Sequence, residues 1–172
     1  MTKTELEKQI AEMQEQFDKM QDELNKLKQV KVEEPKRWKP EVGDLYYCVC
    51  DGGTIIQDVW EDCITDNWRY LTGNIFKTKQ EAEEHKKKIE IQAQFKNFVE
   101  EHSEKLDWTD AYQKKYHIYY CHSNKTIETD WLNTSKIQGA IYASDAHILR
   151  DAINELGEEN IKKYVLEVYD EE

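Results

Sequence analysis

A seven-residue repeat of apolar positions marks the first part of the chain. Charged and amide side chains separate the apolar ones, which leaves a narrow stripe with the a and d spacing of a coiled coil. We therefore predict that residues 1–34 form a helix through which the chain self-associates, as a dimer or with more copies. The alternative is that this helix folds back onto its own domain. The stripe consists of Leu6, Ile10, Met13, Phe17, Met20, Leu24 and Leu27.

Beyond residue 40 the apolar positions follow the spacing of β-strands. The segments DLYYCVC (44–50) and TIIQDVW (54–60) lie on either side of Asp51, Gly52 and Gly53. An aspartate followed by two glycines supplies the positive-φ residues that a tight hairpin turn requires. These segments therefore predict an antiparallel hairpin.

A third extended segment and a helix are predicted to follow the hairpin. The segment NWRYLTGNIF (67–76) combines aromatic and β-branched residues, and we interpret it as a strand. Thr78 is followed three residues later by Glu81, the spacing of a capping box at the start of a helix. The helix is predicted to run from about residue 79 to residue 102.

The second half of the chain repeats this order of elements. The hexapeptide GNIFKT (73–78) returns as GAIYAS (139–144), with an isoleucine and an aromatic residue between the glycine and a hydroxyl residue. Ser144 in this comparison takes the place of Thr78 as the residue that opens a helix. Gly157 is predicted to end that helix.

The repeat predicts an α+β fold built from a duplicated β-β-(β)-α unit. The coiled-coil helix of residues 1–34 comes first, the first unit is predicted to span 35–107, and the second 108–172 with a short C-terminal helix. We expect the strands of both units to form one antiparallel sheet with the helices on one of its faces.

The formal net charge of −12 narrows the class of partner. Residues 100–172 hold sixteen acidic and eight basic residues, so the excess lies mainly there. Binding to nucleic acid or to an anionic membrane requires clustered lysine and arginine side chains, so we expect neither partner. A protein with a basic surface is favoured instead, the alternative being that the charge serves solubility alone.

The sequence shows no recognisable catalytic motif, and we predict a protein that is not an enzyme and has no cofactor. A zinc site made by Cys48, Cys50, Cys121 and a histidine is the best metal-dependent alternative. It lacks a Cys-x-x-Cys pair, and cysteines on strands are commonly small core residues, so we predict free thiols and no metal.

Arg69 is the best candidate for contact with a small ligand. It lies between Trp68 and Tyr70, and a guanidinium group beside aromatic rings can stack on a base or bind a phosphate. The alternative is a structural ion pair of Arg69 with Asp66 or Asp62. The candidate ligand-binding set is Trp60, Trp68, Arg69 and Lys77.

One family resemblance rests on residues spread over most of the chain. The pattern resembles that of small, uncharacterised phage and prophage proteins of Gram-positive bacteria, which also often begin with a coiled coil. It implies a viral source and no particular activity. The matching residues are Trp38-Lys39-Pro40, Gly43-Asp44, Tyr46-Tyr47, Trp60, Asp66, Arg69, Gly73-Asn74, Phe76-Lys77-Thr78 and Glu81-Ala82-Glu83.

These features together predict an oligomeric, phage-encoded interaction protein. Its expected role is counter-defence: inhibition of a host immune protein, such as a CRISPR nuclease, through a basic surface of that protein. The alternatives are a sponge protein that binds a nucleotide signal and a metal-dependent enzyme. The chain opens without a secretion signal, and we expect it in the cytoplasm of the bacterial host.

Overall fold

The computed structural model describes residues 13–14, 16–21 and 37–169, and the chain divides into two units, 1–38 and 39–172. Residues 13–14 and 16–21 of the first unit are helical, and Met13, Phe17 and Met20 are each more than half exposed. The other stripe residues, Leu6, Ile10, Leu24 and Leu27, lie outside the described residues. Self-association through the stripe therefore stays a prediction.

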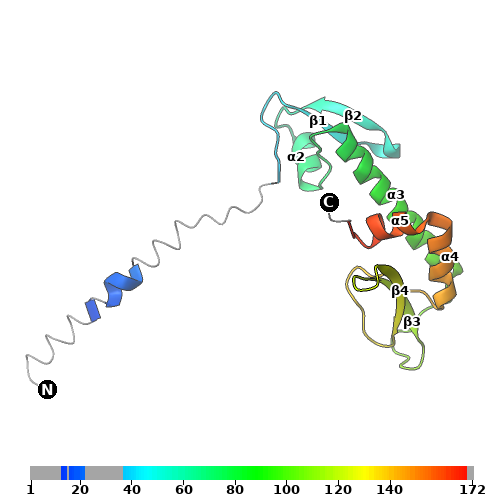
Figure 1. The fold of residues 1–172 in the computed structure, drawn as a ribbon. Helices are drawn as coiled ribbons and strands as arrows, with labels where there is room; N and C mark the ends of the chain where they lie inside the picture. Colours follow the sequence, from blue (N-terminus) through cyan, green and yellow to red (C-terminus); the bar gives the residue numbers. More distant parts are fainter. Residues whose placement is uncertain (1–12, 15, 22–36, 170–172) are drawn as a thin grey trace, which may run out of the picture. The chain divides into compact units, whose positions relative to one another are not determined.

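The second unit is a mixed α+β structure arranged along one long helix (Figure 1). Within the part of the chain that the structure describes, no helix has the length and apolar character needed to cross a membrane. The elements of this unit, in chain order, are β1 (Leu45–Val49), the 3-10 turn η1 (Asp51–Gly53), β2 (Ile55–Val59), α2 (Ile64–Leu71), α3 (Lys79–His102), β3 (Lys115–Cys121), β4 (Thr126–Leu132), α4 (Ala146–Leu156), α5 (Glu158–Asn160) and the π-helical turn η2 (Ile161–Val165).

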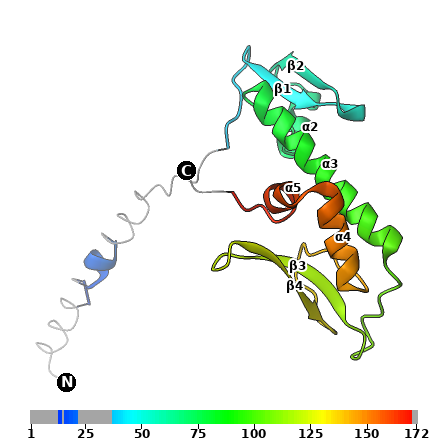
Figure 2. The same cartoon turned by 45° about the vertical axis from the view of Figure 1, so that its right-hand side comes forward.

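The strands form two separate antiparallel hairpins, so the expectation of one shared sheet is wrong. Strand β1 pairs with β2 and β3 with β4, and each sheet has two strands. Helix α3 has 24 residues, which corresponds to a length of about 36 Å. The first hairpin packs on α3, whereas β3 packs on α4, which itself lies against α3 (Figure 2). Helix α3 thus lies between the two hairpins in the sequence and, of the two, packs mainly on the first one.

The predicted third strand at 67–76 is also wrong over most of its length. The structure places α2 there, and Asp66 caps its first turn by accepting hydrogen bonds from the N–H groups of Glu61 (2.9 Å) and Cys63 (3.3 Å). Gly73, with φ of +85°, lies just after the helix ends. The extended part is confined to Phe76, which exchanges two backbone hydrogen bonds of 2.9 Å with Tyr47.

An equivalent backbone bridge occurs in the second hairpin, but its position is shifted by one residue relative to the alignment of the two hexapeptides. Ala143 forms the bridge to Tyr116, although GAIYAS aligns Tyr142 with Phe76. The helix that follows is likewise capped by Asp145 rather than by Ser144, and the carboxylate of Asp145 accepts from the N–H of His147 (2.7 Å).

This one-residue shift changes which side chains face inward. Relative to the two bridges, Lys115 takes the position of Tyr46, and His117 takes that of Cys48. All four are at most 5% exposed. The second hairpin therefore buries a lysine where the first buries a tyrosine. The Lys115 ammonium donates to the carbonyl of Asp110 at 2.8 Å.

Helix α3 contributes to two groups of buried side chains. Ala82 in its first turn is fully buried, and the helix packs on the hairpin of β1 and β2, in and beside which Tyr46, Cys48 and Trp60 are buried. Its second half belongs to the larger core, which contains Ile91, Phe95, Val99, Ile118, Ala143, Leu149, Ala152, Ile161 and Tyr164.

The capping box of α3 is confirmed and offers a test of local stability. The Thr78 hydroxyl accepts from the N–H of Glu81 (3.2 Å), and the Glu81 carboxylate accepts from the N–H of Thr78 (3.2 Å). We expect Thr78→Ala to lower the free energy of unfolding by about 1 kcal/mol, because the helix loses its cap. Thr78→Ser keeps the hydroxyl and should stay near the wild type in urea unfolding. Equal stability of all three proteins would contradict the assigned cap.

Candidate functional site

A chain of side-chain hydrogen bonds fixes α2 to the first hairpin. The Arg69 guanidinium donates through Nη1 to Asp58 Oδ2 on β2 (2.7 Å) and to the Tyr46 hydroxyl on β1 (2.6 Å). The Tyr46 hydroxyl in turn donates to Asp66 Oδ1 (2.7 Å). We call these four residues the α2 anchor. Arg69 therefore forms an ion pair within the fold, but with Asp58 rather than with Asp66 or Asp62.

Burial and hydrogen bonding set the charge states in the α2 anchor. Burial alone would raise the pKa of Asp66, but hydrogen bonds from Tyr46 and from the Glu61 and Cys63 N–H groups hold it below its usual value. Burial also raises the pKa of Tyr46, and its hydrogen bond to Asp66 acts in the same direction. The anchor thus holds an aspartate anion that is 2% exposed beside a protonated tyrosine.

The opposite face of α2 is apolar and points to solvent. Ile64, Trp68 and Leu71 are 79%, 63% and 72% exposed. Their spacing of four and three residues places them on one side of the helix. A surface helix normally buries its apolar face and exposes its polar face. Helix α2 has the reverse arrangement, because the α2 anchor draws Asp66 and Arg69 inward.

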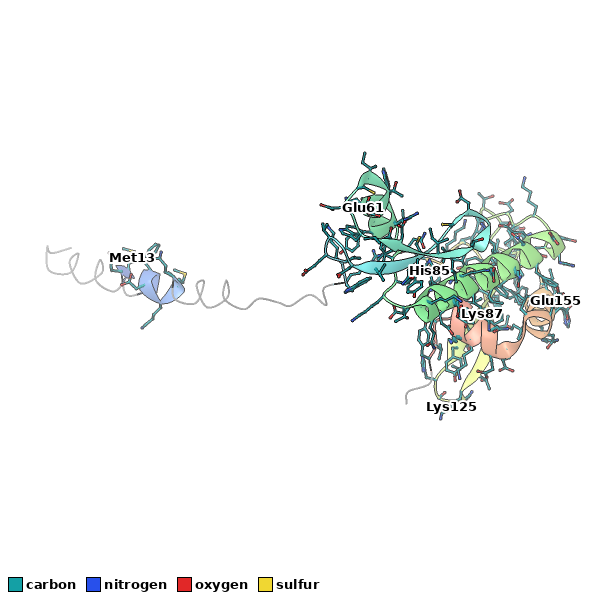
Figure 3. All side chains as sticks on the ribbon, turned by 90° about the horizontal axis from the view of Figure 1, so that it is seen from above. Met13, Glu61, His85, Lys87, Lys125 and Glu155 are labelled. Atoms are coloured by element: carbon teal, nitrogen blue, oxygen red, sulfur yellow. The ribbon has the colours of Figure 1, made fainter. Side chains whose placement is uncertain are left out.

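Acidic side chains border this apolar face. Glu61 and Asp62 lie just before the first turn of α2, and both are exposed. The Asp58 side chain is 44% exposed even though it is bonded to Arg69. We call Ile64, Trp68 and Leu71, together with the acidic border of Glu61 and Asp62, the α2 face. Figure 3 labels Glu61 on this part of the unit.

The structure distributes the four residues of the sequence-derived ligand set over different environments. Trp60 is 1% exposed and makes edge-to-face contacts with Tyr46 and Tyr70. Arg69 belongs to the α2 anchor, Trp68 lies on the α2 face, and Lys77 is exposed just before α3. The structure therefore does not bring these four side chains together on one surface, because Trp60 is buried whereas Trp68 and Lys77 are exposed.

The cysteines are free thiols in different surroundings. Cys48 is buried and burial raises the pKa of its thiol to about 11, Cys50 and Cys121 are partly buried, and Cys63 is exposed. Over the ranges that the structure describes, no group of three or more histidine, cysteine, aspartate or glutamate residues could hold a metal ion.

Sequence reasoning missed Ile64 and Leu71 because it interpreted their neighbours as a strand. A usable signal was present, since apolar residues at 64, 68 and 71 have helical spacing and Asp66 suits the third residue of a helix. The pair Gly73-Asn74, which follows, then marks the end of the helix.

The charge state of Asp66 in the α2 anchor predicts how the free energy of unfolding depends on pH. The folded-state pKa of Asp66 is below its ordinary value of 3.8, so the anion contributes stability above that pH. This contribution is lost as the pH falls through the folded-state pKa. We expect Asp66→Asn to be less stable than the wild type at pH 7 and to lose less stability on acidification, as measured by urea unfolding at pH 7, 4 and 3. Asp151→Asn, at an exposed site on α4, is the control, and identical pH profiles for Asp66→Asn and wild type would contradict the assignment.

Comparison with protein-family models, with curated proteins and with solved structures finds no significant match to this chain. The docking surface proposed below therefore rests on the geometry of the described residues.

Proposed function

We propose that the protein is a non-enzymatic binding protein that docks the α2 face into an apolar groove on another protein. The observation that carries this proposal is the reversed arrangement of α2, with its polar residues inside and Ile64, Trp68 and Leu71 outside. Helices that bind in grooves use apolar anchors at this spacing, and tryptophan is among the residues that contribute most to binding.

Charge complementarity indicates a basic border around the partner's groove. Glu61 and Asp62 flank the apolar residues, and the whole chain carries a net charge of −12. A second copy of the α2 face would bring these carboxylates against like charges, which disfavours self-docking. A groove lined by apolar residues and bordered by lysine or arginine would complement both the apolar residues and the acidic border of the α2 face.

The resemblance to phage and prophage proteins suggests what kind of partner the α2 face would bind. A phage counter-defence protein would act by covering a basic functional surface of a host immune protein, for example the nucleic-acid groove of a CRISPR nuclease. Such grooves are basic because they bind phosphate. The proposed place of action is the cytoplasm of the bacterial host. The N-terminal stripe would join several α2 faces in one particle and raise the avidity for a multivalent target.

The proposal predicts a large effect of α2 substitutions on capture of a partner. Trp68→Ala should weaken binding by about 2 kcal/mol, roughly 30-fold in Kd, because an exposed anchor residue is lost. The measurement compares proteins retained from a Gram-positive bacterial lysate by immobilised wild type and variant at 0.15 M salt. A retained protein that depends on Trp68 is then purified and titrated for its Kd.

Ile89→Ala provides the matched control, because Ile89 is a 51% exposed apolar residue on another helix, α3. Its capture should equal that of the wild type, and both variants should keep the wild-type thermal stability. Equal capture by Trp68→Ala and wild type would overturn the proposed role of the α2 face.

The oligomeric part of the proposal has a separate test. Light scattering of the full chain should give a mass of two or more subunits, whereas a chain that begins at Lys36 should be a monomer. An unchanged number of subunits after truncation would contradict assembly through residues 1–34, and it would leave the α2 proposal intact.

A further inference from the structure

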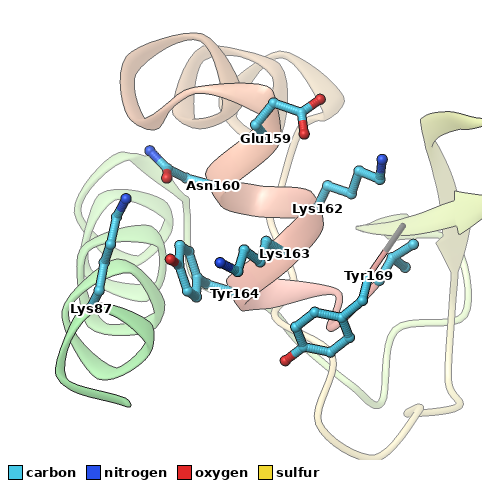
Figure 4. A pocket seen from close by; sticks show the side chains of 8 residues that line it. Lys87, Glu159, Asn160, Lys162, Lys163, Tyr164 and Tyr169 are labelled. Atoms are coloured by element: carbon cyan, nitrogen blue, oxygen red, sulfur yellow. The ribbon is translucent and has the colours of Figure 1, made fainter. Parts of the chain in front are cut away.

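A pocket of about 360 Å³ lies beside the π-helical turn η2 and α3 (Figure 4). Lys87 projects from α3, and Lys162 and Lys163 project from η2. Tyr169 follows η2 in the chain. We call this site the η2 pocket, and it is lined by Lys87, Glu159, Asn160, Lys162, Lys163, Tyr164, Val168 and Tyr169.

The lining of the η2 pocket is net basic, whereas the chain as a whole is net acidic. Three lysines and one glutamate line it, in a chain with a net charge of −12. One of these lysines, Lys163, forms an ion pair with Glu84 at 2.9 Å. Lys87 is exposed, and its ammonium lies 5.3 Å from the centroid of the Tyr164 ring. Cations gathered in an acidic protein create a local potential that attracts an anion.

The walls of the η2 pocket are held firmly. The Tyr164 hydroxyl donates to Glu84 Oε2 (2.8 Å), and the Tyr164 carbonyl accepts from Gln92 Nε2 (2.8 Å). Both partners lie on α3, so η2 is tied to α3 through the side chain and the backbone of one residue. A pocket whose shape is set before binding loses less entropy when a ligand enters.

The backbone of η2 has an unusual hydrogen-bond pattern. The Leu166 N–H donates to the Ile161 carbonyl at 3.0 Å, the wide i to i+5 pattern of a π-helix. Ile161 is fully buried and Tyr164 is 4% exposed, so these two residues point into the core. Both Lys162 and Lys163 line the pocket. Lys163 extends toward α3, whereas Lys162 extends to the other side of η2, where its ammonium lies 5.6 Å from the centroid of the Tyr120 ring (Figure 4). Single π-helical turns are rare and occur frequently at functional sites.

We propose that the η2 pocket binds a small phosphate-bearing anion, specifically a nucleoside polyphosphate. Lys87, Lys162 and Lys163 would neutralise the phosphate groups, for which ammonium groups are suited as compact point charges. The Tyr169 ring, 60% exposed at the edge of the pocket, would stack on the base. The volume falls within the range of about 300–1,000 Å³ that is usual for small-ligand sites.

A nucleic-acid polymer fits this site less well than a single nucleotide. The net negative charge of the chain would repel a long phosphate backbone beyond the pocket, and polymer binding requires an extended basic path. This site also differs from the ligand set derived from the sequence, since it contains none of Trp60, Trp68, Arg69 and Lys77. It lies apart from the α2 face and does not depend on the docking proposal.

Calorimetric titration of the full chain with ATP, inorganic triphosphate and adenosine tests this inference. ATP should bind, triphosphate should bind more weakly, and adenosine should not bind measurably. The double variant Lys87→Gln with Lys162→Gln should lose ATP affinity by roughly tenfold or more for each lysine, because charge-assisted contacts to phosphate are removed. Tyr169→Ala should weaken ATP and leave triphosphate unchanged.

The control is Lys79→Gln, an exposed lysine at the start of the same helix, which should bind ATP as the wild type does. Thermal melts establish that each variant folds. Failure of ATP to bind, or equal ATP affinity in wild type and double variant, would overturn the site. Triphosphate binding as tight as ATP would overturn the stacking role of Tyr169, and tighter binding of a single-stranded oligonucleotide would overturn the choice of a small ligand.

Discussion

The hydrogen-bonded contact between Tyr46 and Asp66 is the constraint on which the arrangement of the first hairpin depends. A buried carboxylate is stable only when its oxygens accept hydrogen bonds, and here the tyrosine hydroxyl and two backbone N–H groups supply them. Arg69 joins the same hydroxyl to Asp58. Because this polar network occupies the inner side of α2, the apolar side of the helix has no core to enter. The exposure of the apolar side of α2 is thus a direct consequence of how the helix is held.

Several residues of the pattern noted in the sequence have structural roles within this framework. Tyr46, Asp66 and Arg69 form most of the α2 anchor. The Asn74 amide bonds both the N–H of Val49 (2.8 Å) and its carbonyl (2.7 Å), as a neighbouring strand would. Thr78 and Glu81 cap α3. These residues stabilise the first hairpin and the helices beside it, whereas Ile64 and Leu71, on the proposed docking face, lie outside the pattern.

The parts of the fold that the sequence predicted are those with local causes. The turn at Gly52 and Gly53 requires positive φ, and both glycines have φ of +77°. The capping box at Thr78 and the end of α4 at Gly157, with φ of +87°, depend on neighbouring residues alone. Each of these features follows from backbone sterics or from a hydrogen bond within a few positions.

The parts that the sequence did not predict depend on distant contacts. Helix α2 is fixed by partners on β1 and β2, and aromatic residues in its sequence suggested a strand. The one-residue shift between the repeats is set by which residue bridges to Tyr116, and the similarity of the two hexapeptides concealed it. The η2 pocket unites α3 with η2 through the bonds of Tyr164 to Glu84 and Gln92, which are 80 and 72 positions away. Composition, in which acidic residues outnumber basic ones, gave no indication of a local basic site.

The α2 anchor turns an apolar helix face toward solvent. Hydroxyl-radical footprinting of the full chain compares the oxidation rates of Trp68 and Trp60 within one sample. We expect rapid oxidation of Trp68, which is 63% exposed, and strong protection of Trp60, which is 1% exposed. Protection of Trp68 equal to that of Trp60 in the free protein would show that its own chain or another copy covers this face, and the face would then not be open to a partner.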